Sequence, residues 1–153
     1  MKILDLLKAE NIFIDFPVKN KKDFFQKAVS IIVGQCPQFH QEEMLSLFLE
    51  REKTMSTGIG KKIAIPHIIY GKCQSQRLYI FSLRSSIDFK ALDQQPVELI
   101  IVFVGPKTES NLPYLQILAK FSRLMKNDQM VEKLLKSRTK ETIFQVLKDY
   151  EQC

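Results

Sequence analysis

The stretch VELIIVFVG, residues 97–105, constrains the fold more than any other part of the sequence. It is a nearly continuous apolar run of strand length, and such runs are typical of a β-strand that is buried on both faces. A strand of this kind needs one layer of structure above it and another below it. The sequence therefore predicts a sheet that is covered on both sides.

Helical and strand-like patterns surround this run. Further strands are predicted over 11–16, 62–65 and 77–84, and helices over 3–8, 21–33, 41–53, 111–125, 129–136 and 140–150. Asp128 and Thr139 are the expected N-caps of the last two helices. The expected core face of the helix over 111–125 consists of Leu115, Leu118, Phe121, Leu124 and Met125. These elements predict an α/β fold, a three-layer sandwich whose central mixed sheet has about five strands and is flanked by helices.

The 153 residues show no linker, repeat or low-complexity segment, and we expect one domain over 1–153. No apolar run approaches ~18 residues and the N-terminus has no secretory pattern, so we expect a cytoplasmic protein without membrane insertion. Three widely spaced cysteines fit a reducing compartment, and we predict no metal site and no cofactor. The net charge of +6 favours an acidic partner or nucleic acid, but the basic residues are scattered, and a nucleic-acid partner is not expected.

The stretch STGIGKKIAIPHIIY, residues 56–70, combines a pattern typical of anion binding with a histidine. Pro66 fixes its own φ and disfavours helix at Ile65, so the backbone that leads into His67 is expected to be extended and stiff. The start of the stretch permits a tight turn with exposed backbone N–H groups, and these, with two hydroxyls, can surround an anion. The residues of this predicted turn are Ser56, Thr57, Gly58 and Gly60.

Arg51 lies just upstream, and its guanidinium is suited to bind a phosphate through two N–H groups. A neutral imidazole is a nucleophile, and an ordinary pKa near ~6.5 leaves His67 largely neutral at pH 7. Nucleophile, anion site and arginine together indicate transfer of a phosphoryl group to His67. The alternative is that His67 ends a core strand and binds only backbone. The other histidine, His40, is expected on the surface, and Tyr70 is expected to contribute local packing.

The segment LEREKTMSTGIGKKIAIPHI, residues 49–68, closely resembles the active-site signature of the enzyme IIA domains of the bacterial phosphotransferase system. The resemblance is to the fructose/mannitol type, which includes nitrogen-related regulatory proteins. It extends over nearly the whole chain, because ILDLLKAENIFIDF, IDFKALDQQPVELIIVFVGP and YLQILAKFSRLM also read like that family.

The resemblance implies a function. In this family a histidine-containing phosphocarrier protein passes its phosphoryl group to the histidine at the position of His67. Sugar-transport members then pass the group to an enzyme IIB, whereas in nitrogen-related members the phosphorylation state tunes binding to regulatory targets. Arg51 matches the active-site arginine of the family, and Thr57 and Gly58 match the turn near the phosphate. We expect the nitrogen-related role, with the sugar-transport role as the alternative.

One position departs from the family pattern. Where the family commonly has a second active-site histidine, at the start of the helix YLQIL, this sequence has Tyr114. Its hydroxyl can donate a hydrogen bond to a phosphate or to His67, or the ring only fills space. A further alternative is therefore a regulatory binding module that has lost phosphotransfer. For a docking protein, the expected apolar rim of the pocket includes Met55, Ile59 and Ile68.

Overall fold

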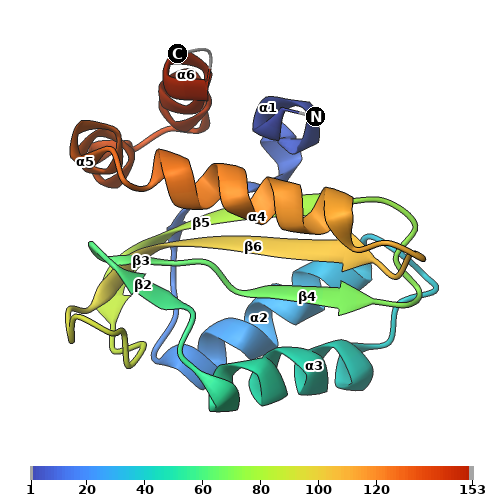
Figure 1. The fold of residues 1–153 in the computed structure, drawn as a ribbon. Helices are drawn as coiled ribbons and strands as arrows, with labels where there is room; N and C mark the ends of the chain where they lie inside the picture. Colours follow the sequence, from blue (N-terminus) through green and yellow to red (C-terminus); the bar gives the residue numbers. More distant parts are fainter. Residues whose placement is uncertain (1, 152–153) are drawn as a thin grey trace.

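A computed structural model describes residues 2–151 and shows a sheet between two layers of helices (Figure 1). The helices α2 (Lys21–Gly34) and α3 (Gln41–Thr54) cover one face. The helix α4 (Leu112–Leu124) runs across the other face, with α5 at its end and α1 and α6 on the same side of the sheet. The predicted α/β three-layer sandwich is confirmed. Within the described residues the sheet has six strands, where about five were expected.

The remaining elements complete the two layers and the sheet. The other helices are α1 (Ile3–Leu6), α5 (Asp128–Lys136), α6 (Lys140–Glu151) and the short 3-10 helix η1 (Ala9–Asn11). The strands are β1 (Ile12–Phe16), β2 (Gly58–Gly60), β3 (Ile63–Ala64), β4 (His67–Tyr70), β5 (Arg77–Ile87) and β6 (Val97–Pro106).

Strand β6 is the centre of the sheet, as its apolar sequence predicts. The strand order is β1-β5-β6-β3-β2, and β4 also pairs with β6. Strand β5 is antiparallel to β6, whereas β3 and β4 are parallel to it. Alternate β6 side chains enter two hydrophobic cores: Ile100, Val102 and Val104 pack toward α2 and α3, and Leu99, Ile101 and Phe103 pack toward α4. This alternation explains why the strand is apolar at every position from Leu99 to Val104.

The strands β3 and β4 behave as one strand that is interrupted at Pro66. Ile63 pairs with Leu99 and His67 pairs with Phe103, so the register along β6 is the same before and after the interruption. Pro66 has no N–H to donate to the ladder. The N–H of Ile65 turns away from β6 and donates to the carbonyl of Thr57, at 2.9 Å. The predicted single strand over 62–65 is therefore shorter than expected, and a second strand begins at His67.

The expected glycine turn is instead the strand β2, which pairs antiparallel with β3. The tight turn lies between β2 and β3, at Lys61 and Lys62, whose φ angles are 58° and 68°. Gly58 is required for a close approach, because a Cβ there would lie 2.8 Å from the Cβ of Ala91.

The core face of α4 is rotated relative to the prediction. Phe121 and Met125 are buried as expected, but Leu115 is 56% exposed, and Tyr114 and Ile117 are buried instead. Leu118 and Leu124 are only partly buried. The physical cause is Gly105 on β6: a Cβ there would lie 2.4 Å from Cδ1 of Tyr114, so the missing side chain leaves room for the tyrosine ring.

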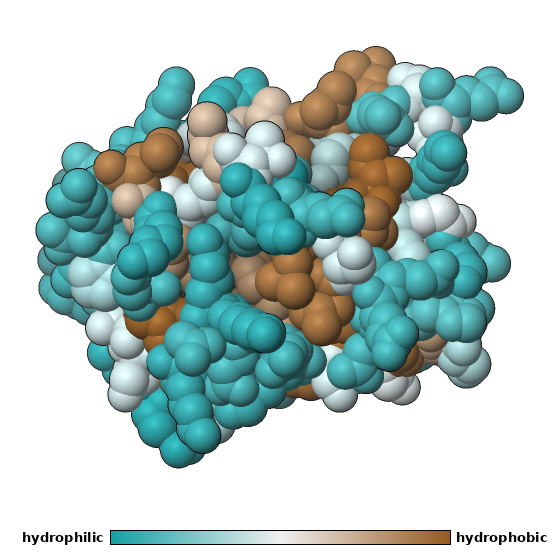
Figure 2. All heavy atoms as spheres, turned by 90° about the horizontal axis from the view of Figure 1, so that it is seen from below, coloured by the Kyte–Doolittle hydropathy of each residue, from teal (hydrophilic) through white to brown (hydrophobic). Residues whose placement is uncertain are grey.

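One of the two predicted helix caps is wrong. Helix α5 begins at Asp128, and its cap is Asn127, whose side chain accepts a hydrogen bond from the N–H of Met130. The Thr139 cap is confirmed, because its hydroxyl accepts from the N–H of Thr142 at 3.1 Å. Figure 2 shows the face covered by α2 and α3, where hydrophilic side chains separate smaller hydrophobic areas, as expected for helices that bury one side against a sheet.

Candidate functional site

His67 is the first residue of β4 and lines a cavity of about 220 Å³ at the end of α3. The cavity is lined by Arg51, Met55, Ser56, Thr57, Ile59, Ile65, His67, Leu92, Leu118 and Ser122. The fold thus brings His67 together with three of the predicted site residues. The lining comes from α3, the turn after it, β2, β4, the loop after β5, and α4.

The tautomer of His67 follows from one hydrogen bond. Its Nδ1 lies 2.7 Å from the carbonyl oxygen of Ile65. A carbonyl oxygen can only accept, so Nδ1 of the neutral ring carries the proton and Nε2 carries the lone pair. The carbonyl is available because Ile65 faces away from β6 after the interruption at Pro66. The proline that stiffens the chain therefore also helps to fix which ring nitrogen can act as a nucleophile.

Burial lowers the pKa of His67 below its ordinary value, and the positive charge of Arg51 lowers it further. The hydrogen bond to Ile65 and the negative charge of Glu52 act in the opposite direction. Because the pKa is lowered, the imidazole is neutral over a wider pH range than an exposed histidine. The site therefore favours the nucleophilic form of His67 at neutral pH.

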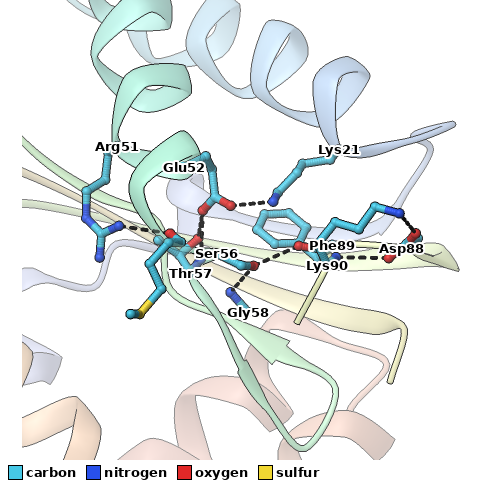
Figure 3. Close-up of polar contacts among 10 residues, drawn as sticks. Lys21, Arg51, Glu52, Ser56, Thr57, Gly58, Asp88, Phe89 and Lys90 are labelled. Atoms are coloured by element: carbon cyan, nitrogen blue, oxygen red, sulfur yellow. Dashed lines mark hydrogen bonds and ion pairs between the residues drawn. The ribbon is translucent and has the colours of Figure 1, made fainter. Parts of the chain in front are cut away.

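Arg51 occupies the last turn of α3, and its guanidinium lines the same cavity as His67. Its Nη1 donates to the carbonyl of Met55 at 2.9 Å, which ties the side chain back to the end of its own helix (Figure 3). Only one of the five guanidinium N–H groups is needed for that bond. The remaining donors and the charge suit an anion in the cavity.

The two hydroxyls of the turn and the N–H groups of Thr57 and Gly58 are engaged within the protein in this structure. Ser56 donates its hydroxyl to the carbonyl of Phe89, at 2.7 Å, and accepts from the N–H of Gly58, at 3.1 Å. Thr57 donates both its N–H and its hydroxyl to the carboxylate of Glu52. Figure 3 shows these bonds as one connected network. The predicted role of these three residues as phosphate ligands stays a prediction, and it requires that a phosphate replace some of these partners.

Sequence reasoning missed Glu52. A glutamate in the last turn of a helix is unfavourable, because the C-terminal end of the helix dipole is negative. Glu52 follows Arg51 in that turn of α3, so its position indicated a specific partner. The structure supplies two partners, Thr57 and the ammonium group of Lys21.

Tyr114 lies beside His67 but makes no hydrogen bond to it among residues 2–151. The ring centroids are 6.2 Å apart and the rings are inclined by 51°. Tyr114 is 7% exposed, and burial raises the pKa of its hydroxyl, which keeps the group protonated. The aromatic contact supports the predicted place of Tyr114 near the pocket. Its role toward a phosphate or the imidazole stays a prediction.

The two residues that we expected outside the site lie as expected. His40 is exposed, directly before α3. The hydroxyl of Tyr70 accepts from the N–H of His40 and donates to Glu43, both at 3.0 Å. Tyr70 thus joins β4 to the start of α3.

The apolar rim of the pocket differs from the prediction at one residue. Met55 is 57% exposed and Ile59 is 44% exposed, as expected, but Ile68 is buried because its side chain packs toward α2 and α3. Leu92, which sequence reasoning missed, is 70% exposed and lines the cavity. We define the apolar rim as Met55, Ile59 and Leu92.

Two features of the described residues concern metal binding and membrane insertion. Among residues 2–151, no group of three or more His, Cys, Asp or Glu side chains is placed to hold a metal ion. Within the same part of the chain, none of the helices is long and apolar enough to span a membrane.

Comparison with known proteins relates the chain to one family. Residues 5–150 match the family described as "Phosphoenolpyruvate-dependent sugar phosphotransferase system, EIIA 2". A nitrogen regulatory protein from Pseudomonas aeruginosa is 26% identical over 97% of this chain and 96% of its own length. The mannitol-specific phosphotransferase enzyme IIA component of Geobacillus stearothermophilus is 29% identical over 95% of this chain and 97% of its own length.

Solved structures agree with this relationship. The nitrogen regulatory protein IIA-Ntr from Neisseria meningitidis superposes with a TM-score of 0.87 at 25% identity, over 95% of this chain and 98% of that protein. The mannitol enzyme IIA of Escherichia coli, solved in complex with phosphorylated enzyme IIB, has a TM-score of 0.73 over 94% of this chain and 97% of that protein. At 18% identity the second comparison shows a shared fold.

Proposed function

The chain belongs to the type-2 enzyme IIA family of the phosphoenolpyruvate-dependent sugar phosphotransferase system, and on this premise we propose that it carries a phosphoryl group on His67. The observation that carries the proposal is the 2.7 Å contact of Nδ1 with the carbonyl of Ile65, beside the guanidinium of Arg51. This contact leaves Nε2 as the nucleophilic nitrogen. The family match supports one enzyme IIA unit for the chain.

The transfer step forms one P–N bond and breaks another. The Nε2 lone pair of His67 attacks the phosphorus atom of a phosphohistidine on the donor protein. A new P–N bond forms, the P–N bond in the donor breaks, and the donor nitrogen keeps the electron pair. The proton on Nδ1 stays in place, held by the carbonyl of Ile65. The ring then carries a positive charge next to the negative phosphoryl oxygens, and a return transfer reverses the same bonds.

Arg51 stabilises the negative charge on the phosphoryl oxygens during transfer. Charge-directed donors in a partly dehydrated site are a large source of rate enhancement. The donors of Ser56, Thr57 and Gly58 and the hydroxyl of Tyr114 have supporting roles in this proposal. Ser56 and Gly58 must exchange their present partners to contact phosphoryl oxygens, whereas Thr57 keeps its bonds to Glu52 and supports the turn.

The donor of the phosphoryl group is a histidine-containing phosphocarrier protein that docks on the apolar rim. Exposed Met55, Ile59 and Leu92 surround the entrance to a charged site. Burial of apolar side chains is favourable, so these three residues can hold a docked partner. Such a contact around the entrance also removes water from the site where the phosphoryl group is exchanged.

The nitrogen-related regulatory role is the first choice. The similarity to the nitrogen regulatory proteins of Pseudomonas aeruginosa and Neisseria meningitidis covers nearly all of each protein, and it supports this choice. The full-length similarity to a mannitol enzyme IIA supports sugar transport, with an enzyme IIB as acceptor, as the second candidate. The third candidate is a regulatory module without phosphotransfer, because Tyr114 stands where the family commonly has a second histidine.

One reconstitution separates the three candidates. The protein is incubated with phosphoenolpyruvate, the general enzyme I and the phosphocarrier protein, and its intact mass is measured. A carrier gains one phosphoryl group, whereas a module without phosphotransfer gains none. Addition of an enzyme IIB then removes the group from a sugar-transport protein and leaves it on a regulatory one.

A further inference from the structure

The carboxylate of Glu52 binds Thr57, which lines the His67 cavity, and the Glu52 side chain is 6% exposed. One carboxylate oxygen accepts hydrogen bonds from the N–H of Thr57, at 2.9 Å, and from its hydroxyl. The other oxygen forms an ion pair with the ammonium group of Lys21 (Figure 3). A buried carboxylate is costly unless it is paired and hydrogen-bonded, and both conditions are met here.

Arg51 and Glu52 hold the turn after α3 from two sides. Arg51 donates to the carbonyl of Met55, and Glu52 accepts from Thr57, two residues further along. Between them, Ser56 donates to the carbonyl of Phe89. Three consecutive residues of the turn are thus each held by a separate bond, which positions the turn beside His67.

Lys21 extends this network to a second helix. It lies in the first turn of α2, and its ammonium group is 4.6 Å from the ring centroid of Phe89. The carbonyl of the same phenylalanine accepts from Ser56. Lys21, Glu52, the turn and Phe89 therefore form a closed ring of contacts, visible in Figure 3.

We propose that Glu52 is a positioning residue for phosphoryl transfer, which holds Thr57 in place and balances the charge of Arg51 beside His67. The inference rests on the proposed function of His67. In the proposed transfer step the His67 ring becomes positively charged next to Arg51. A nearby carboxylate makes that charge less unfavourable, and it does so without contacting the phosphoryl group.

Several charged and titratable groups lie around His67, and the test must separate the effect of Glu52 from the effects of the others. Arg51 and Glu52 come from α3 and act on the imidazole in opposite directions. Tyr114 faces the ring from α4 and is neutral. Lys21 comes from α2 and is paired with Glu52. The nearby Asp88 and Lys90, after β5, are paired with each other at 3.0 Å.

The test compares Glu52→Gln with Glu50→Gln. Both substitutions remove one negative charge from the same helix and keep the size of the side chain, but Glu50 is exposed. We expect His67 to titrate at lower pH in Glu52→Gln when its imidazole is followed by NMR, and to be unchanged in Glu50→Gln. Phosphoryl transfer should slow on the order of tenfold in Glu52→Gln, by analogy with supporting residues of other sites.

A second variant separates positioning from charge. Thr57→Val removes the hydroxyl and keeps the carboxylate, so we expect transfer to slow by a similar factor while the pH at which His67 titrates stays near that of the wild type. Because the two residues act through one contact, the double variant should be little slower than either single variant. Thermal unfolding of each variant confirms that the measured protein is folded. If Glu52→Gln does not fold, the proposal is decided by Thr57→Val alone. A wild-type rate of phosphoryl transfer in Thr57→Val then overturns the proposal.

The outcomes distinguish the inference from the function on which it rests. If the wild type accepts a phosphoryl group and Glu52→Gln keeps both the transfer rate and the His67 titration, the role of Glu52 is overturned and the proposed function stands. The role of Glu52 is also overturned if the rate losses of the two single variants multiply in the double variant. If the wild type accepts no phosphoryl group, the NMR titration still decides whether Glu52 acts on His67.

Discussion

At the level of single residues, the protonation of His67 decides whether the site contains a nucleophile. Burial and Arg51 lower its pKa in the folded protein. We expect an NMR titration of the His67 imidazole to have its midpoint below ~6.5, the ordinary value. A midpoint at or above that value would show that Glu52 and the hydrogen bond to Ile65 raise the pKa more than burial and Arg51 lower it.

The same shift predicts how stability depends on pH. Because His67 has a lower pKa in the folded state, the unfolded chain binds its proton more readily between the two pKa values. The contribution of His67 to the free energy of unfolding is therefore full above ~6.5 and falls as pH decreases through the folded pKa. His67→Gln should lose this contribution, whereas His40→Gln changes an exposed histidine outside the site. Denaturant unfolding of the three proteins at pH 5.5 and 7.5 provides the measurement, and equal losses of stability in all three would contradict it.

Arg51→Lys tests the guanidinium while it keeps the charge. Lysine cannot present two parallel N–H groups to a phosphoryl group, so transfer should slow on the order of ten- to a thousandfold. Single-turnover transfer from the phosphorylated carrier measures the rate. Lys53→Arg, at an exposed position of the same turn, serves as the control, and it should transfer at the wild-type rate. A wild-type rate in both Arg51→Lys and Arg51→Ala would remove Arg51 from the site.

Residue by residue, the sequence indicated the chemistry of the site better than its bonding. Pro66 and His67 stand where the pattern placed them. Glu52 was missed because a charged residue in a helix shows no apolar pattern, and only the unfavourable end of the helix dipole hinted at a partner. Ile68 was misplaced because β4 begins at His67, which turns the next side chain into the core.

At the level of elements, the contact between β6 and α4 places Tyr114 beside His67. Gly105→Ala would put a Cβ 2.4 Å from Cδ1 of Tyr114 and 2.9 Å from Oε1 of Gln76. We expect this overpacking to lower the free energy of unfolding by about 1–3 kcal/mol and to displace the tyrosine ring. Gly71→Ala is the matched control, because nothing lies within 4 Å of a Cβ at that position. Equal stability of the two variants would mean that α4 does not depend on Gly105.

The elements themselves were largely predictable because their patterns are local. The apolar run of β6 and the paired phenylalanines of α2 determine where those elements lie. The face of α4 was not predictable in the same way, since Leu115 and Tyr114 both fit a helical apolar stripe. The choice between them depends on Gly105, which is close to α4 only in the folded chain.

At the level of the whole molecule, the apolar rim predicts where the donor protein docks. Leu92→Ser removes an apolar side chain that is 70% exposed, so the folded protein should lose little stability. We expect the donor concentration for half-maximal transfer to rise on the order of tenfold, the size of a moderate contact loss at an interface. Phe144→Ser, on α6, changes another exposed apolar residue away from the site and should leave transfer unchanged. An equal effect of both substitutions would place the docking surface elsewhere.

The central proposal is that His67 takes up the phosphoryl group, and labelling tests it most directly. Wild-type protein, His67→Ala and His40→Ala are incubated with phosphoenolpyruvate, enzyme I and phosphocarrier protein, and the bound phosphoryl group is measured by intact mass. We predict one group on the wild type and on His40→Ala, stable in alkali and lost in acid as a P–N bond is, and none on His67→Ala. Uptake of the group by His67→Ala at the wild-type level would contradict the proposal.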